Sequence, residues 1–380
     1  MNDEQTDSQD IDAAQVDGAQ PGQNGHAPER TTPPAPRWRR AALVFTTVAL
    51  AYAATSAGYL ASPSPHFHFV DLAQSFLDGR LDTDTPRRRG GAAAQEGDPV
   101  GYQVAIDRAT RSGSEGWNDW ASYRVLGLRG GDEVRGVFPF KDTKGPRSQE
   151  FWTVGGESMV IDTDRDLATG CDPLRPAAKC DRVVYQVSFP PFPAVVMMPF
   201  VALIGFHIHD VVLTLLFGAL SALLLLLWLD RMASEGLIDH NRIDRLWIVA
   251  LFAFGTVAWY CAIRGAVWFT ALTMGVTLHF AYLIAAERAR RPLLAGALLA
   301  LGVATRTPLL FGAIFLPLEA LFPDGRWLGG RGRDGLRDAV RALALYAAPL
   351  ALMGLTLAWY NWARWQNPLE FGHFYLLEGT

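Results

Sequence analysis

The stretch VVLTLLFGALSALLLLLWL, at residues 211–229, contains no charged side chain. An uninterrupted apolar run of this length is typical of a helix that crosses the roughly 30 Å hydrocarbon layer of a membrane. We predict further spans at other apolar stretches of the chain, namely 41–61, 247–263, 265–286, 292–305, 308–322 and 342–360. The sequence therefore predicts an α-helical polytopic membrane protein with about seven spans.

The arginines fall on alternate sides of these predicted spans. Clusters precede the first span and occupy the second, fourth and sixth connections; they are Arg37, Arg39, Arg40, Arg231, Arg242, Arg245, Arg288, Arg290, Arg291, Arg326, Arg331, Arg333, Arg337 and Arg341. The opposite short connections carry little more than one cation each, Arg264 and Arg306. Because short loops rich in Lys and Arg stay in the cytoplasm, we predict a multi-pass protein of the plasma (inner) membrane with a cytoplasmic N-terminus.

Two of the predicted spans are short. The run 292–305 would reach only about 20 Å as a helix, and 308–322 follows directly after it. A single kinked helix over both runs is the alternative, but it would move the arginine-rich loop after Leu321 to the outer side. We therefore predict two short helices that meet before Pro308, a residue that can start a helix without losing a hydrogen bond.

The ends of the chain differ from this apolar part. Residues 1–29 hold seven acidic residues and no Lys or Arg, so we predict a disordered cytoplasmic tail at 1–36. For 41–61 a cleaved signal peptide is the alternative, although the length of the run favours an uncleaved span. After the transmembrane helical domain at 207–360, we expect 361–380 to be an extracytoplasmic segment that either ends the protein or marks a truncation.

Residues 62–206 form the predicted extracytoplasmic loop. At 66–78 apolar residues recur at helical spacing, which predicts an interfacial helix with its polar face toward water. Residues 192–206 are apolar throughout but interrupted by a proline, which favours a second interfacial helix. Between them we predict a small β-rich insertion at 99–187, with short β-prone runs that begin at Tyr102, Ala121, Val134 and Val183.

Two of the three cysteines, Cys171 and Cys180, belong to this insertion. Outside the cytoplasm such a pair can form a disulfide, which contributes about 2–3 kcal/mol for so small a loop. Two free thiols are the alternative, and the predicted outer location favours the disulfide.

Asp71 is the first candidate for catalysis. On an interfacial helix its carboxylate would face the outer headgroup layer, where a general base could deprotonate a sugar hydroxyl. The alternative is that Asp71 only solvates the polar face of the helix. His66 and His68 lie within about one turn and could tune or replace it.

Arg264 and Arg306 are candidates for binding a phosphate, because a guanidinium offers a planar fork of donors to its oxygens. Anchoring of the helix ends by snorkelling is the alternative for both. Trp268 is assigned to the same candidate substrate site, or else to the aromatic belt of a membrane interface.

His207 and Asp210 lie in a His-x-His-Asp motif just before the span at 211–229 and are further candidates for substrate binding. Such a motif could also ligate a divalent ion, but no third convergent group supports it, so we predict no metal and no cofactor.

Aspartates at 162, 164 and 166 resemble the start of a calcium loop. Leu167 occupies the position at which that loop requires glycine, and no Glu closes a loop of twelve residues. Both departures favour an ordinary turn.

No nucleotide-binding glycine loop, serine elbow or HExxH motif occurs in the chain, so a lipid-carried donor suits this topology better than a nucleotide. The segments FVDLAQSFLDGRLD (69–82), YQVSFPPFPAVVMMPFVALIG (185–205) and RRPLLAGALLALGVATRTPLLFGAIF (290–315) resemble the GT-C class of membrane glycosyltransferases. Their order and spacing are similar to the protein O-mannosyltransferase and aminoarabinose-transferase superfamily, over most of 41–322.

The resemblance implies sugar transfer from a polyprenyl-phosphate-linked donor to a lipid, glycan or protein acceptor at the outer face of the membrane. In that superfamily a carboxylate of the first outer loop is the base, often in an Asp-Glu pair. The matching positions here read Pro65-His66, so Asp71 is the nearby carboxylate. Arg264 and Arg306 would then hold the departing phosphate.

A non-enzymatic polytopic membrane protein is the alternative, either a lipid or glycan transporter or a degenerate binding relative. A transporter predicts inverted repeats around a site at the membrane midplane. We find no clear repeat, and the polar candidates lie toward the outer side, which favours the enzyme. Nucleic acid is not an expected partner, because topology accounts for the basic residues.

Overall fold

The structure is a computed structural model that describes residues 37–61, 64, 68–83, 120–138 and 148–376. The predictions for the tail at 1–36, for His66 and for the β-prone run at Tyr102 lie outside the described residues.

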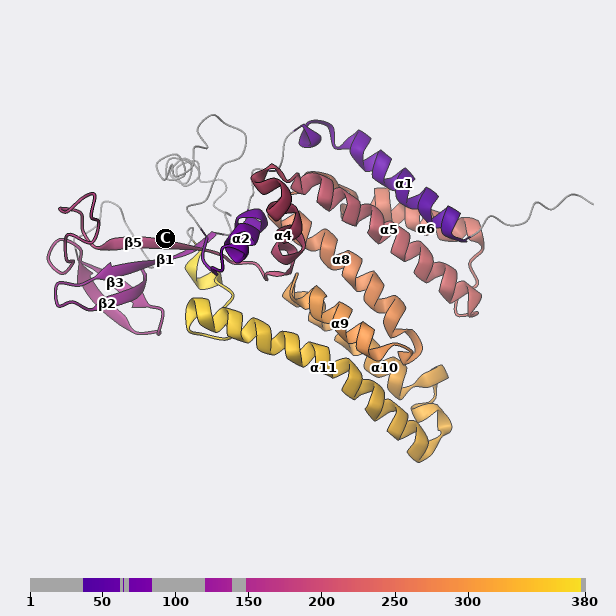
Figure 1. Ribbon diagram of the computed structural model, residues 1–380. Helices are drawn as coiled ribbons and strands as arrows, with labels where there is room; N and C mark the ends of the chain where they lie inside the picture. Colours follow the sequence, from indigo (N-terminus) through magenta and orange to yellow (C-terminus); the bar gives the residue numbers. More distant parts are fainter. Residues whose placement is uncertain (1–36, 62–63, 65–67, 84–119, 139–147, 377–380) are drawn as a thin grey trace, which may run out of the picture.

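Most of the described chain is helical, and five helices lie side by side in a row (Figure 1). In their order across the row these are α1 (Arg37–Thr55), α5 (Asp210–Ser234), α8 (Val267–Ala286), α9 (Pro292–Val303) and α11 (Gly332–Trp365). The shorter helices of the same part are α6 (Arg242–Gly255), α7 (Val257–Arg264) and α10 (Phe315–Leu321). Each helix of the row packs mainly against its neighbours.

Three of the described helices, α5, α8 and α11, are long and apolar enough to cross a membrane. Helices α6 and α7 meet the same criterion only together, as a pair bent by 56°, which gives up to four spans by length and composition. α9 and the stretch 307–321 are shorter apolar helices. The described residues thus contain fewer full-length spans than the seven predicted.

The predicted spans differ from the structure where hydroxyl and glycine residues interrupt apolar runs. The run 247–263 breaks after Gly255, where Thr256 is extended and its hydroxyl caps α7 by accepting from the Ala258 amide at 3.1 Å. The run 41–61 breaks at Ser56, whose hydroxyl donates back to the Ala53 carbonyl at 2.8 Å. Periodicity does not record these local hydrogen bonds.

Small and hydroxylated residues hold the row together. Thr214 and Ser221 of α5 form hydrogen bonds of 2.7 Å with Thr270 and Thr277 of α8. Gly296 of α9 lies so close to α11 that an added Cβ would stand 2.2 Å from a backbone carbonyl oxygen. Such contacts are typical of helices that associate where apolar burial in water does not drive association.

The arginine-rich connections gather at one end of the row, opposite the sheet (Figure 1). Asp230, at the end of α5, binds both Arg40 of α1 and Arg245 of α6, with the shorter N–O distance of 2.8 Å to Arg245. Glu235 binds Arg288 and Arg290 at 3.0 and 2.8 Å. The connections that carry the clustered arginines therefore lie at one end of the row.

A five-stranded antiparallel sheet lies at the other end, with the strand order β4-β3-β2-β1-β5. The strands are β1 (Trp120–Gly127), β2 (Glu133–Val137), β3 (Ser148–Thr153), β4 (Ser158–Asp162) and β5 (Asp181–Val187). The small β-containing insertion is thus present, and three of its strands lie at predicted runs. β3 and β4 were not predicted, because neither segment alternates apolar and polar residues.

Both faces of the sheet are covered. Ala121, Tyr123 and Val125 of β1 point to one face, where Trp365 and Tyr375 pack on them. On the other face Phe138, Phe151, Ile161 and Leu167 form a second small core with Leu126. A disulfide joins Cys171 to Cys180 beside this core, as predicted. The segment after α11 therefore docks onto the sheet and joins it to the helices.

Two short helices lie where the sheet meets the row, α2 (His68–Leu77) and α4 (Phe192–Ile204). They pack against each other and against the start of α8, around Phe69, Leu72 and Met197. Both correspond to the predicted interfacial helices.

Candidate functional site

Asp71 lies in the interior of the protein. Asp71, His68 and Ser75 share one face of α2, because residues three and four apart lie above one another on a helix. Their exposed fractions are 7%, 1% and 2%. The prediction that this face points to water is therefore wrong, because α2 is inserted against α4, β5 and α8 instead of lying on a surface.

A carboxylate at such a position costs free energy unless its partners compensate for the lost water. The Ser75 hydroxyl donates a hydrogen bond to the backbone carbonyl of Asp71 at 3.0 Å, within the same helix. A carboxylate buried inside the protein is a candidate functional group.

Arg306 is half-buried and is linked to α2 by aromatic rings. Its Cζ lies 5.5 Å from the centroid of the Phe189 ring, and that ring meets Phe69 of α2 edge-on at 5.7 Å. The Phe192 amide donates to the Ala304 carbonyl at 2.9 Å, which holds the start of α4 against the turn that carries Arg306. Two ring contacts thus link this guanidinium to Phe69, on the apolar face of the helix that carries Asp71.

Trp268, in the first turn of α8, packs on the same apolar cluster as Phe69 and Phe189. It is half-buried and also contacts Phe269. The structure therefore brings three of the predicted site elements together: the helix of Asp71 and His68, Arg306, and Trp268.

Arg264 occupies a different place. Its guanidinium donates to the hydroxyls of Tyr59 and Tyr260 and lies 4.8 and 4.5 Å from their ring centroids. Gly265 follows with φ of +63°, a left-handed conformation that lets the chain pass against Val211. Arg264 is thus held by the segment after α1 and by its own helix, whereas Arg306 lies beside α2.

Asp210 and His207 do not form a shared site. Asp210 is buried and accepts from the Ser64 amide at 2.9 Å and from the Ser64 hydroxyl, so it fastens the segment after α1 to the start of α5. His207 is exposed, and His209 contacts the Leu60 carbonyl at 3.2 Å. Within the described ranges, no group of three or more His, Cys, Asp or Glu could hold a metal ion.

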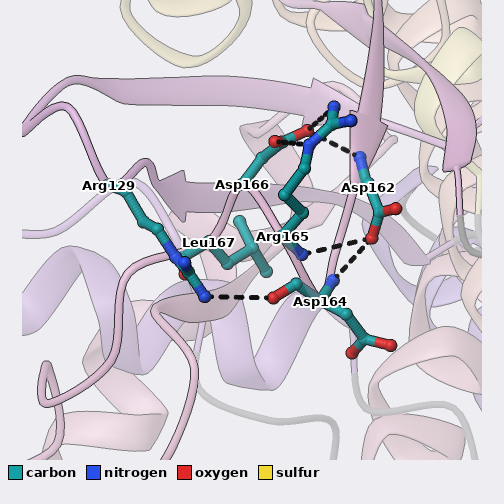
Figure 2. A network of polar contacts seen from close by, with 6 residues as sticks. All are labelled: Arg129, Asp162, Asp164, Arg165, Asp166 and Leu167. Atoms are coloured by element: carbon teal, nitrogen blue, oxygen red, sulfur yellow. Dashed lines mark hydrogen bonds and ion pairs between the residues drawn. The ribbon is translucent and has the colours of Figure 1, made fainter.

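The aspartate-rich turn closes on itself, as Figure 2 shows. Asp162 accepts from the amides of Asp164 and Arg165 at 2.9 and 3.2 Å, and Asp166 accepts from the Arg165 guanidinium at 2.7 Å. The hydrogen bond from Arg165, with that from the Asp162 amide, holds the pKa of Asp166 below its usual value. Arg129 donates to the carbonyls of Asp164 and Leu167. These hydrogen bonds stabilise the turn itself, which agrees with the predicted ordinary turn.

Sequence reasoning missed Arg364, near the end of α11. It is 4% exposed, donates to the Val187 carbonyl at 2.7 Å and lies 3.9 Å from the Tyr360 ring centroid. That ring contacts Phe76 of α2 at 6.2 Å. The available signal was a cation between two tryptophans, in Trp362-Ala-Arg-Trp365, at the end of an apolar run.

No family model, curated protein or solved structure matches this chain. The GT-C resemblance stays a prediction from the quoted motifs.

Proposed function

We propose that the protein is an integral membrane protein with its arginine-rich end in the cytoplasm. The outward surface of the row supports this proposal, because it is apolar along helices long enough to span. On α11 alone, Leu352, Leu355, Trp359 and Trp362 are exposed, with 68% exposure at Leu352. In water a patch of this kind would promote aggregation, whereas lipid chains would cover it.

The distribution of charge supports the orientation. The clustered arginines share one end, and short cation-rich loops stay cytoplasmic. The sheet and its Cys171–Cys180 disulfide lie at the other end, in keeping with an oxidising outer compartment.

We further propose that this outer end transfers a sugar from a polyprenyl-phosphate-linked donor to a hydroxyl of a lipid, glycan or protein acceptor. The observation that supports the proposal is the contact chain from Arg306 through Phe189 to Phe69, which links a half-buried cation to α2, the helix that also carries the buried Asp71. The resemblance of these segments to GT-C glycosyltransferases indicates the class of the proposed reaction, which is glycosyl transfer.

In the proposed reaction the acceptor oxygen forms a bond to the anomeric carbon while the bond from that carbon to the phosphate oxygen breaks. Asp71 takes the proton of the acceptor hydroxyl, with His68 beside it on α2. Polyprenyl phosphate leaves with the electron pair, and Arg306 stabilises its negative charge. Trp268 would pack on the apolar parts of the bound substrates, and Arg264 would act only at the periphery.

The test uses the full chain in liposomes with polyprenyl-phosphate-linked hexoses and pentoses, and measures the release of polyprenyl phosphate. Asp71→Asn should reduce release at least about a hundredfold, as expected for removal of a general base. Asp78→Asn, an exposed carboxylate that follows the same helix, is the matched control. Full release by Asp71→Asn would exclude the proposed base.

The non-enzymatic alternative gives a different result in the same liposomes. A glycan-binding or transporting protein would retain or move the labelled donor without releasing polyprenyl phosphate, in the wild type and in Asp71→Asn alike.

A further inference from the structure

A groove of about 660 Å³ lies between the β3–β4 hairpin and the segment after α11. One wall comes from the sheet, with Glu150, Trp152 and Glu157, and the other from Glu370, Phe374 and Tyr375. This volume is within the range of sites that bind small molecules. The residues proposed for glycosyl transfer do not line it.

Aromatic side chains give the groove a flat apolar surface. Trp152 and Phe374 stack with their ring planes 12° apart and their centroids 5.3 Å apart. The Trp152 indole donates to Glu150 at 2.7 Å, which fixes its plane, and Phe374 is 49% exposed. A broad ring surface that remains half open to solvent suits a ligand with a flat apolar face.

Hydrogen-bonding groups surround these rings. The lining includes the carboxylates of Glu150, Glu157 and Glu370 and the amides of Gln366 and Asn367, and it contains no Lys or Arg among the residues that the structure describes. Burial and the nearby Glu370 raise the pKa of Tyr375 to about 12, so its phenol stays a donor at neutral pH. Acceptors in excess over donors match a ligand that carries many hydroxyl groups.

The groove is held in shape before any ligand binds. Tyr375 stacks on the fully buried Trp365, with centroids 4.5 Å apart, and Leu376 pairs with Ala121 of β1. Glu370 accepts from the Gly372 amide at 2.6 Å, which closes a turn within the wall that follows α11. A preformed site binds with a smaller loss of conformational entropy.

A continuous series of contacts leads from the groove to α2. The Arg364 guanidinium contacts the ring of Trp365 and also lies over the ring of Tyr360. Tyr360 in turn contacts Phe76 of α2. A ligand in the groove would therefore lie at the same end of the molecule as Asp71.

We propose that this groove binds an oligosaccharide, one sugar ring of which stacks on an outer face of the Trp152–Phe374 pair while its hydroxyls donate to the glutamates. Its role as the site for a glycan acceptor rests on the proposed glycosyl transfer, whereas binding itself does not. The inference narrows the acceptor class from lipid, glycan or protein to glycan.

The test measures binding of the full chain, in lipid nanodiscs, to a panel of immobilised neutral oligosaccharides of hexoses, N-acetylhexosamines and pentoses. At least one member should bind the wild type, and Trp152→Ala should weaken it about tenfold or more, as expected for removal of an aromatic anchor. The matched control is Trp327→Ala, an exposed tryptophan that also packs on a phenylalanine, at the arginine-rich end. Phe374→Leu, which keeps an apolar side chain, provides a second variant with a smaller expected loss.

An oligolysine peptide is the competing probe, because the glutamates could instead attract a cation. Binding of oligolysine that is lost in the double variant Glu150→Gln and Glu157→Gln, with no sugar bound by the wild type, would overturn the proposal. Equal sugar binding by Trp152→Ala and the wild type would overturn it as well.

Failure of the transferase proposal gives a different pattern. Asp71→Asn should keep full oligosaccharide binding, since it does not line the groove. Sugar binding without any release of polyprenyl phosphate would support the oligosaccharide site and contradict the proposed glycosyl transfer. Asp71-dependent release with no binding in the panel would support the transfer and contradict the oligosaccharide site.

Discussion

Arginines at the two ends of the helical row are held in opposite ways. At the end away from the sheet, Arg231, Arg245 and Arg290 each bind a carboxylate at 2.8–2.9 Å. At the sheet end, Arg264 and Arg364 lie over tyrosine rings, and the ion pairs of the described residues include neither. The same residue type therefore neutralises its charge at one end and retains it at the other.

The difference follows from what an aromatic ring can do. A ring attracts a cation through its quadrupole but carries no net charge, so the guanidinium keeps its field. A carboxylate cancels that field and leaves a structural link between helices. The ring-held arginines at the sheet end thus keep their positive field, whereas the ion-paired arginines at the other end serve stability.

The largest effect on this comparison should come from Arg231→Ala. The Glu287 carboxylate, only 4% exposed, would lose its partner at 2.9 Å. Breaking a buried pair from one side leaves an uncompensated charge, so we expect a loss of about 3 kcal/mol in stability. Thermal unfolding in detergent measures it.

Arg242→Ala serves as its control, because Arg242 is exposed at the first residue of α6. The double variant Arg231→Ala with Glu287→Gln should recover most of the loss. Equal melting temperatures of Arg231→Ala and Arg242→Ala would contradict the structural role of this ion pair.

At the sheet end the disulfide should carry the next largest effect. Removing it with Cys171→Ser and Cys180→Ser together should lower the stability of the sheet by about 2–3 kcal/mol, because the unfolded chain regains the entropy of a short open loop. Cys261→Ser, at a half-buried cysteine of α7, is the matched control. Identical unfolding curves with and without reductant would argue against the bridge.

Replacing Arg264 by Lys tests the rings themselves. A lysine keeps the charge but cannot donate to Tyr59 and Tyr260 in the same planar geometry, so we expect a loss of about 1 kcal/mol. Arg245→Lys, at the ion-paired end, should lose less if charge alone matters there. A larger loss at Arg245 would reverse the comparison drawn from the two ends.

Sequence patterns predicted much of the fold and less of the site. The apolar run at 211–229 became α5, and the helical spacing at 66–78 became α2. The burial of Asp71 was not predicted, because amphipathicity shows which residues share a face and not what covers that face. Arg364 was missed for a related reason, since its importance comes from a contact with Val187 far away in the chain.

The sequence by itself determined where the helices α5, α2 and α4 form, and it favoured the pairing of Cys171 with Cys180, because apolar length, helical spacing and short separation are local properties. Only the tertiary structure decided that Arg306 is linked to α2 through Phe189 while Arg264 lies between tyrosines, and that the segment after α11 completes a groove with β3. These arrangements depend on packing between segments far apart in the chain, which no local pattern records.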